Sequence, residues 1–159
     1  MTVQVGDSIP EVNLKVLGDQ GPADISTAEI FSGKKVVLFA VPGAFTPTCS
    51  AAHLPGYVAN ADKIKEKGVD VIVCVSVNDP FVMTAWGQAQ NAEEIMMVAD
   101  PAGEFATAMG TELDGSGFGL GKRSSRYSLV AEDGKITALN LEQGGAFEVS
   151  SAEAILEAL

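Results

Sequence analysis

Two long apolar runs rich in β-branched residues constrain the fold of this chain more than any other feature. The first, KVVLFAV, occupies residues 35–41, and the second, VDVIVCVSV, occupies residues 69–77. Strands that are apolar on both faces belong in the middle of a sheet, where helices cover each side. Apolar residues recur at helical spacing from about 49 to 67, so the two runs predict neighbouring strands joined by a helix.

Breaker residues divide the middle of the chain. Gly68 stands where a C-terminal helix cap belongs, and Pro55 predicts a kink inside the helix over about 49–67. Asp79-Pro80 marks the start of the next helix. A third strand is expected over residues 95–99, and Asp100-Pro101 then repeats the helix-start pattern.

The two ends of the chain predict smaller elements. The alternation of Val12, Leu14 and Val16 indicates a short strand and turn outside the main sheet, and Ser26 with Glu29 resembles a capping box.

Near the C-terminus, residues 126–132 and 135–142 flank Asp133-Gly134, a strong two-residue hairpin pattern. A last helix is expected to open at Ser150, with Glu153 placed for a capping box.

This order of elements predicts an α/β, thioredoxin-like fold: a central, mostly parallel sheet with a C-terminal antiparallel hairpin, flanked by helices. A flavodoxin-like fold needs a helix between the last two strands, and the turn at 133–134 leaves no room for one. With 159 residues, 47% of them hydrophobic, the chain is expected to form a single domain over 1–159.

The charge balance excludes several classes of partner. With 10 basic against 21 acidic residues, the net charge is −11, which repels nucleic acid and anionic membrane surfaces. The N-terminal residues contain no basic and apolar signal pattern, so we expect a cytoplasmic protein. The clustered basic residues Lys122, Arg123 and Arg126 nevertheless form a local positive spot for a small anionic group.

Two cysteines and one histidine limit the chemistry. Cys49 and Cys74 are too few for a disulfide scaffold and lack zinc spacing, and His53 is the only histidine. We therefore expect no metal site, and the cysteine chemistry considered below needs no bound organic cofactor.

Cys49 lies where a thiol becomes reactive. It follows a central strand and the loop PGAFTPT, at the first turn of the long helix, where free N–H groups and the helix dipole favour a thiolate. Thr46 can point its hydroxyl at the sulfur or at a substrate oxygen. Pro42 and Pro47 stiffen the loop and exclude water.

A reactive Cys49 also needs a fixed positive charge, for which Arg126, at the start of the first hairpin strand, is the candidate and Arg123 the fallback. His53 follows Cys49 by one helical turn. We expect it to satisfy local hydrogen bonds rather than to act as a base.

The segment PGAFTPTCS at 42–50 resembles the active-site loop of the peroxiredoxins. The segments HLPGY (53–57), VSVNDPFVMTAW (75–86) and SSRYS (124–128) are similar to the type II, or peroxiredoxin 5, branch of that family. The resemblance extends over nearly the whole chain.

The resemblance implies a thiol peroxidase for hydrogen peroxide and small organic hydroperoxides. Cys49 would attack the O–O bond and become a sulfenic acid, the first step of thiol oxidation. Thr46 and Arg126 would orient the oxygens, and Pro42 would shield the product. The resemblance also implies a homodimer, with Phe45, Phe81 and Trp86 as an aromatic interface patch beside the site. The alternative is that these aromatic residues belong to the core.

The return of the sulfenic acid to a thiol needs a second thiol. Cys74 is the only internal candidate, but its strand position places it roughly 10 Å below the sheet edge, whereas a disulfide needs Cα atoms within ~7 Å. We therefore expect an external reductant: glutathione, glutaredoxin or thioredoxin.

Two alternative functions use the same cysteine. A cysteine hydrolase or acyltransferase with His53 is disfavoured, because a nucleophile elbow has glycine two residues to each side, where this chain has Pro47 and Ala51. A peroxide-responsive redox sensor or holdase without turnover stays open, and turnover with a recycling thiol distinguishes it from a peroxidase. The glycine-rich segment 115–121 is expected to be a surface or interface loop.

Overall fold

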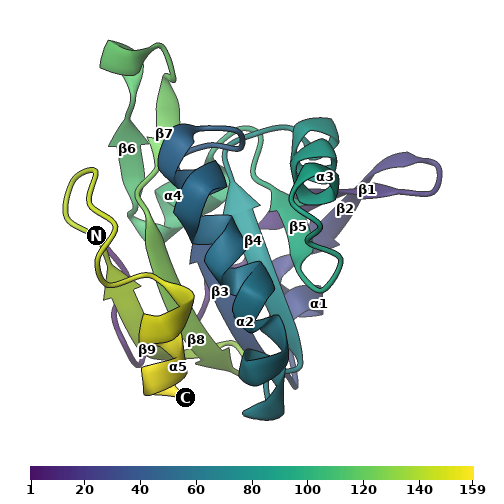
Figure 1. Ribbon diagram of the computed structural model, residues 1–159, viewed down its shortest axis with the longest axis vertical. Helices are drawn as coiled ribbons and strands as arrows, with labels where there is room; N and C mark the ends of the chain where they lie inside the picture. The colour runs from purple at the N-terminus through teal and green to yellow at the C-terminus, as the bar shows by residue number, and fades with distance from the viewer.

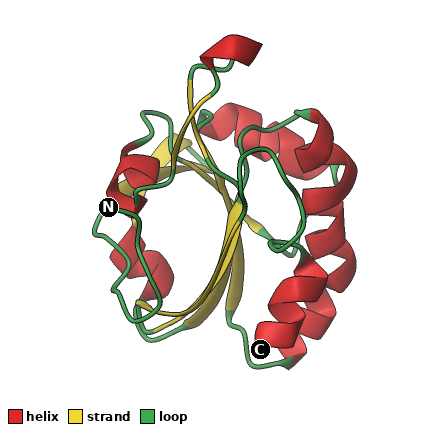
Figure 2. Ribbon diagram, turned by 90° about the vertical axis from the view of Figure 1, so that its left-hand side faces the viewer, coloured by secondary structure: helices red, strands yellow, loops and turns green.

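The computed structural model describes residues 1–159 and contains a seven-stranded sheet with helices on both sides (Figures 1 and 2). The strands are β1 (Asn13–Gly18), β2 (Gly21–Ser26), β3 (Lys35–Ala40), β4 (Val71–Ser76), β5 (Met96–Ala99), β6 (Glu112–Asp114), β7 (Lys122–Ser124), β8 (Tyr127–Glu132) and β9 (Lys135–Leu141). The helices are α1 (Thr27–Phe31), α2 (Leu54–Glu66), α3 (Pro80–Ala89), α4 (Glu104–Met109) and α5 (Ala152–Ala158). None of them is both long and apolar enough to cross a membrane.

The sheet has the order β2-β1-β5-β4-β3-β8-β9. The central strands β3, β4 and β5 are parallel, and β8 and β9 form the antiparallel hairpin that the Asp133-Gly134 turn predicts. Both turn residues have positive φ, at 48° and 78°, as a tight two-residue turn requires. The predicted thioredoxin-like fold is confirmed.

Strand β3 joins the two halves of the core. Val37, Phe39 and Val41 face the cluster formed with α2, α3 and α5, and Val36, Leu38 and Ala40 face the cluster formed with α1 and α4. This alternation follows from the two-residue period of a strand. It explains why the run at 35–41 is apolar throughout.

Several predicted helix boundaries are confirmed. Ser26 and Glu29 form a reciprocal capping box at the start of α1, and the Asp79 carboxylate caps α3 by accepting from the Val82 N–H at 2.8 Å. The kink expected at Pro55 takes the form of a π-helical turn over Cys49–His53 that ends where α2 begins. Pro55 has no N–H to donate to the carbonyl of Ala51, four residues earlier, and its ring crowds that carbonyl. The α-helical hydrogen-bond pattern is therefore interrupted in the turn before Pro55.

Three local predictions were wrong. The hairpin β1–β2 is not outside the main sheet, because Lys15 of β1 pairs with Ala99 of β5 and covers an otherwise open edge. The segment after Asp100-Pro101 reaches α4 only at Glu104, and the cap of α5 is Ser151 rather than Ser150. The glycine-rich segment 115–121 lies largely at the surface, as expected, and it connects the two strands of a hairpin, β6–β7, that the sequence did not predict.

Asp100 explains the late start of α4. Its buried carboxylate accepts from the N–H groups of Phe105 and Ala106, both at 3.0 Å, and so caps the helix from outside its first turn. Burial raises the pKa of Asp100, against the effect of these two bonds.

Replacing Asp100 with alanine leaves these two N–H groups without their partner. We expect the Asp100→Ala variant to lose about 1–2 kcal/mol of unfolding free energy, measured by chemical denaturation. The matched control is Asp19→Ala, an exposed aspartate expected to change stability by less than ~0.5 kcal/mol. Equal stabilities of the two variants would contradict this account of α4.

Candidate active site

Cys49 is fully buried at the carboxyl end of β3. The strand ends at Ala40, and the chain returns through the loop 42–48 into the π-helical turn that begins at Cys49. The N–H of Ser50 donates to the Thr46 carbonyl at 3.0 Å, which holds the loop against the helix. The thiol therefore lies at the first turn of the long helical segment, as the sequence predicts.

Arg126 lies directly against this thiol. It precedes Tyr127 of β8, which pairs with Ala40 at the end of β3, so the strand register brings the arginine to the loop after β3. Its Nη2 donates to the Sγ of Cys49 at 3.3 Å. Arg126 is only 6% exposed, and no carboxylate is within ion-pair distance of it. The predicted proximity of Arg126 and Cys49 is confirmed, whereas Arg123 does not contact the sulfur.

His53 is held as a neutral ring. The Nη1 of Arg126 donates to Nδ1 of His53 at 2.9 Å, so the proton on Nε2 is the one that the Ser150 carbonyl accepts at 3.0 Å. Burial lowers the pKa of His53 to about 3, and the positive charge of Arg126 contributes to this shift. Both ring nitrogens are occupied and neither faces the thiol as a base. The expectation that His53 satisfies local hydrogen bonds is confirmed.

A loop between β9 and α5 covers the arginine and the histidine. The Phe147 ring centroid lies 5.7 Å from Cζ of Arg126 and 4.9 Å from the His53 ring centroid. Tyr57 stacks on Phe39 at 3.9 Å and donates its hydroxyl to the Ser150 carbonyl at 2.9 Å. The sequence analysis did not predict that this loop covers the site, because no motif links the loop to Cys49, which is far away along the chain.

Thr46 and Pro42 lie in the loop before Cys49. The Thr46 hydroxyl donates to the Gly43 carbonyl at 2.6 Å, so its proton is engaged and its oxygen remains an acceptor. The Pro42 carbonyl accepts from Arg123 at 3.3 Å. A Cβ on Gly43 would lie 2.8 Å from Nη1 of Arg123, so a side chain here would displace the end of the arginine from the loop. Arg123 thus fastens the loop instead of serving the thiol.

Cys74 lies inside the sheet. It is fully buried in β4, where it pairs with Phe39 of β3, and both cysteines are free. Burial raises the pKa of the Cys74 thiol well above its usual range, and the charge of Cys49 adds to this effect. Because the thiolate is the attacking form, Cys74 is a poor nucleophile.

The aromatic residues near the site divide into two groups. Phe45 and Phe81 are 57% and 58% exposed, and Phe45 adopts a left-handed backbone with φ 63°. Trp86 is instead fully buried, and its Nε1 donates to the Ser50 hydroxyl at 3.0 Å. Trp86 therefore belongs to the core behind the site, and only the two phenylalanines are available at the surface.

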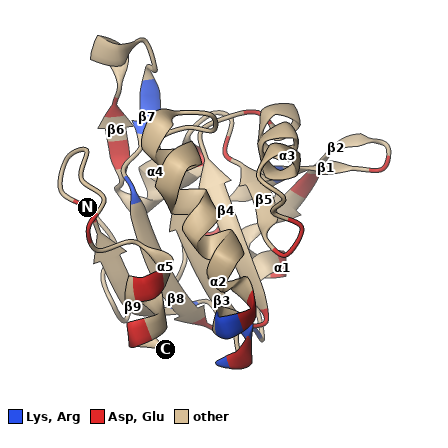
Figure 3. Cartoon of the chain, viewed as in Figure 1, with Lys and Arg blue, Asp and Glu red and all other residues tan.

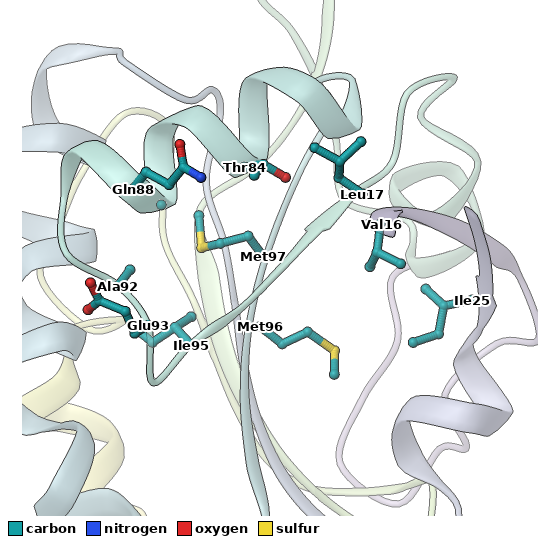
Figure 4. Close-up of a pocket in the computed structure, with 11 residues that line it drawn as sticks. Val16, Leu17, Ile25, Thr84, Gln88, Ala92, Glu93, Ile95, Met96 and Met97 are labelled. Atoms are coloured by element: carbon teal, nitrogen blue, oxygen red, sulfur yellow. The ribbon is translucent and has the colours of Figure 1, made fainter. Parts of the chain in front are cut away.

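The largest cavity of the protein is elsewhere. It measures about 420 Å³ and lies between α3, β5 and the β1–β2 hairpin, where Met96, Met97 and Val16 line it (Figure 4). Neither Cys49 nor Arg126 contributes to its lining, so this cavity is separate from the Cys49 site.

Charged groups do not gather into a metal site. No group of three or more His, Cys, Asp or Glu side chains is placed to hold a metal ion.

The basic residues Lys122 and Arg123 lie in β7, which is partly blue in Figure 3, on the hairpin that leads into β8.

Comparison with known proteins gives consistent matches along the whole chain. The Redoxin family model matches residues 4–156. Peroxiredoxin-2D of Arabidopsis thaliana is 48% identical over 159 residues, covering 99% of this chain and 98% of that protein.

Two solved structures are similar. Reduced Prx3 from Vibrio vulnificus in complex with H2O2 superposes with a TM-score of 0.96 at 55% identity, covering 99% of both chains. Peroxiredoxin 5 from Alvinella pompejana gives a TM-score of 0.86 at 39% identity, covering 98% of this chain and 97% of that one.

The neutral state of His53 predicts a measurable pH dependence of stability. The folded pKa lies below the unfolded value of 6.5, so below pH 6.5 the unfolded chain binds a proton that the folded one does not. The unfolding free energy should therefore decrease as pH falls, approaching a slope of about 1.4 kcal/mol per pH unit between pH 6 and 5.

The variant His53→Gln removes the only histidine and should flatten this slope in denaturation series from pH 7 to 5. The carboxyl groups that titrate near this window are common to both proteins, so the difference isolates His53. A variant with the slope of the wild type would show that His53 is not buried in its neutral form.

Proposed function

Because this chain belongs to the redoxin family, as a type II peroxiredoxin and therefore a thiol peroxidase, we propose that Cys49 is its peroxidatic residue and Arg126 its principal activating group. The observation that carries this proposal is the bond from Nη2 of Arg126 to Sγ of Cys49 at 3.3 Å, inside a buried site. A guanidinium without a carboxylate partner stabilises the thiolate, which is the nucleophile.

In the proposed reaction, the Cys49 thiolate attacks one oxygen of the peroxide. An S–O bond forms as the O–O bond breaks, which leaves Cys49 as a sulfenic acid. The leaving oxygen takes up a proton and departs as water or, from an organic hydroperoxide, as an alcohol. Donors that are already oriented stabilise the charge that develops on the oxygens, which is the role we assign to Arg126. The Thr46 hydroxyl oxygen accepts a hydrogen bond from the O–H of the incoming peroxide, because the Thr46 hydroxyl donates its own hydrogen bond to the Gly43 carbonyl.

Pro42 shields the reacting sulfur in this proposal. Its half-buried ring has no N–H, and its carbonyl is tied to Arg123, so the start of the loop is stiff and offers no free donor. Hydrogen peroxide and small organic hydroperoxides are the proposed substrates. The Vibrio vulnificus relative, whose structure contains H2O2, supports the first of these.

We assign the second half of the cycle to an external thiol. A first thiol attacks the sulfenic sulfur and releases water, and a second thiol breaks the mixed disulfide and restores Cys49. The burial and raised pKa of Cys74 argue against an internal resolving reaction. Glutathione, glutaredoxin and thioredoxin are the proposed reductants. Cytoplasmic location stays a prediction.

Mutation of each cysteine tests the assignment. Cys49→Ser is expected to abolish peroxide consumption, because the serine hydroxyl is not ionised at neutral pH. Cys74→Ser is expected to leave consumption largely intact when glutathione and glutaredoxin are supplied, in a coupled steady-state assay. Full activity of Cys49→Ser would overturn the mechanism, and loss of activity in Cys74→Ser would restore the internal disulfide.

The same assay separates a peroxidase from a redox sensor. A peroxidase consumes many equivalents of peroxide per chain while the thiol lasts. A sensor or holdase stops after one equivalent.

We also propose that the chain forms a homodimer through a surface that contains Phe45 and Phe81. Exposed aromatic side chains are favoured at protein interfaces. Phe45 lies in the loop before Cys49, and Phe81 lies in α3, the helix whose Trp86 ring is 6.5 Å from that of Phe45. Sedimentation velocity at micromolar concentration should show a dimer, which Phe81→Glu weakens. A monomeric wild-type protein would contradict the proposal.

A further inference from the structure

One carboxylate holds the loop between β9 and α5. The Oε2 of Glu142 accepts four hydrogen bonds: from the N–H groups of Glu148 at 2.8 Å, Val149 at 2.9 Å and Ser150 at 2.9 Å, and from the Ser150 hydroxyl at 2.7 Å. Glu142 is only 5% exposed. Burial opposes its ionisation, but these bonds outweigh burial and lower the pKa of Glu142.

The loop that Glu142 holds is the one that covers the active arginine. Ser150 is bound on both sides: its N–H and hydroxyl donate to Glu142, and its carbonyl accepts from Nε2 of His53. Phe147 lies in the same loop, with its ring against His53 and Arg126.

The orientation of Arg126 depends on this chain of contacts. Its guanidinium has no carboxylate to fix it, and its side-chain hydrogen bonds are those to Cys49 and His53. The His53 ring is in turn fixed at its other nitrogen by Ser150. The backbone adds a direct link, because the Glu142 N–H donates to the Arg126 carbonyl at 3.0 Å.

We propose that Glu142 is a positioning residue for peroxide reduction: by clamping the 142–151 loop, it fixes Ser150 and His53 and thereby aims Arg126 at Cys49. The proposal rests on the roles assigned above to Cys49 and Arg126. Glu142 does not touch the sulfur, and it acts only through the residues that it holds.

The test compares Glu142→Ala and Glu142→Gln with Glu148→Gln. Glu148 is exposed in the same loop and contributes only its N–H to the clamp, so its variant loses an equal charge without losing an acceptor. The readouts are the rate constant of the reduced protein with hydrogen peroxide and the pH dependence of Cys49 alkylation, followed by peptide mass so that Cys74 is not counted.

Glu142→Ala should slow the peroxide reaction on the order of tenfold or more, because a small displacement of a positioned group has large kinetic effects. It should also move the midpoint of the alkylation profile to higher pH, since Arg126 then stabilises the thiolate less. Glu142→Gln keeps an acceptor oxygen without the charge and should slow the reaction only about threefold. Glu148→Gln should match the wild type.

A folded Glu142→Ala with wild-type rate and midpoint would overturn the proposal, as would a Gln variant as impaired as the Ala variant. If Glu142→Ala fails to fold, Glu142→Gln decides: a slower reaction with a raised midpoint supports the clamp, and wild-type values in both refute it. Cys49→Ser is measured alongside. Peroxide reduction by that variant would instead refute the proposed function.

Discussion

The bond between the buried guanidinium of Arg126 and the sulfur of Cys49 is the interaction on which the rest of this structure depends. A buried cation is costly unless an anion or hydrogen-bond acceptors compensate for it. Here no carboxylate does so, and the partners are the thiol, a neutral imidazole and an aromatic face. In the function proposed above, the positive charge of Arg126 is therefore available to stabilise the Cys49 thiolate.

The sheet makes this contact possible between residues 77 positions apart. Ala40 at the end of β3 pairs with Tyr127 at the start of β8, so the loop that leads to Cys49 and the residue before Tyr127 emerge at the same edge. The hairpin turn at 133–134 and the pairing of β3 with β8 fix this register. A slip of one residue would turn Arg126 away from the sulfur.

Short sequence patterns predicted most of the strands, helices and turns around the site. The features that the sequence did not predict depend on contacts between residues far apart along the chain. The apolar runs, the Asp79 cap and the turn at 133–134 are encoded within a few residues, as is the loop that presents Cys49. The cap of α4 by Asp100 and the clamp by Glu142 use side chains that reach backbone groups beyond the usual capping positions, so no short pattern revealed them. Phe147 joins the site only through the folded loop, and its sequence neighbours give no indication of that role.

The most direct test of the central claim is to mix the reduced protein with one equivalent of hydrogen peroxide, quench over milliseconds, and follow free thiols together with intact mass and peptide maps. The account predicts rapid loss of one thiol and gain of one oxygen atom at Cys49, with Cys74 unchanged. Loss of both thiols with two hydrogens removed would make Cys74 the resolving residue and contradict the external reductant. Survival of both thiols would contradict the role of Cys49 itself.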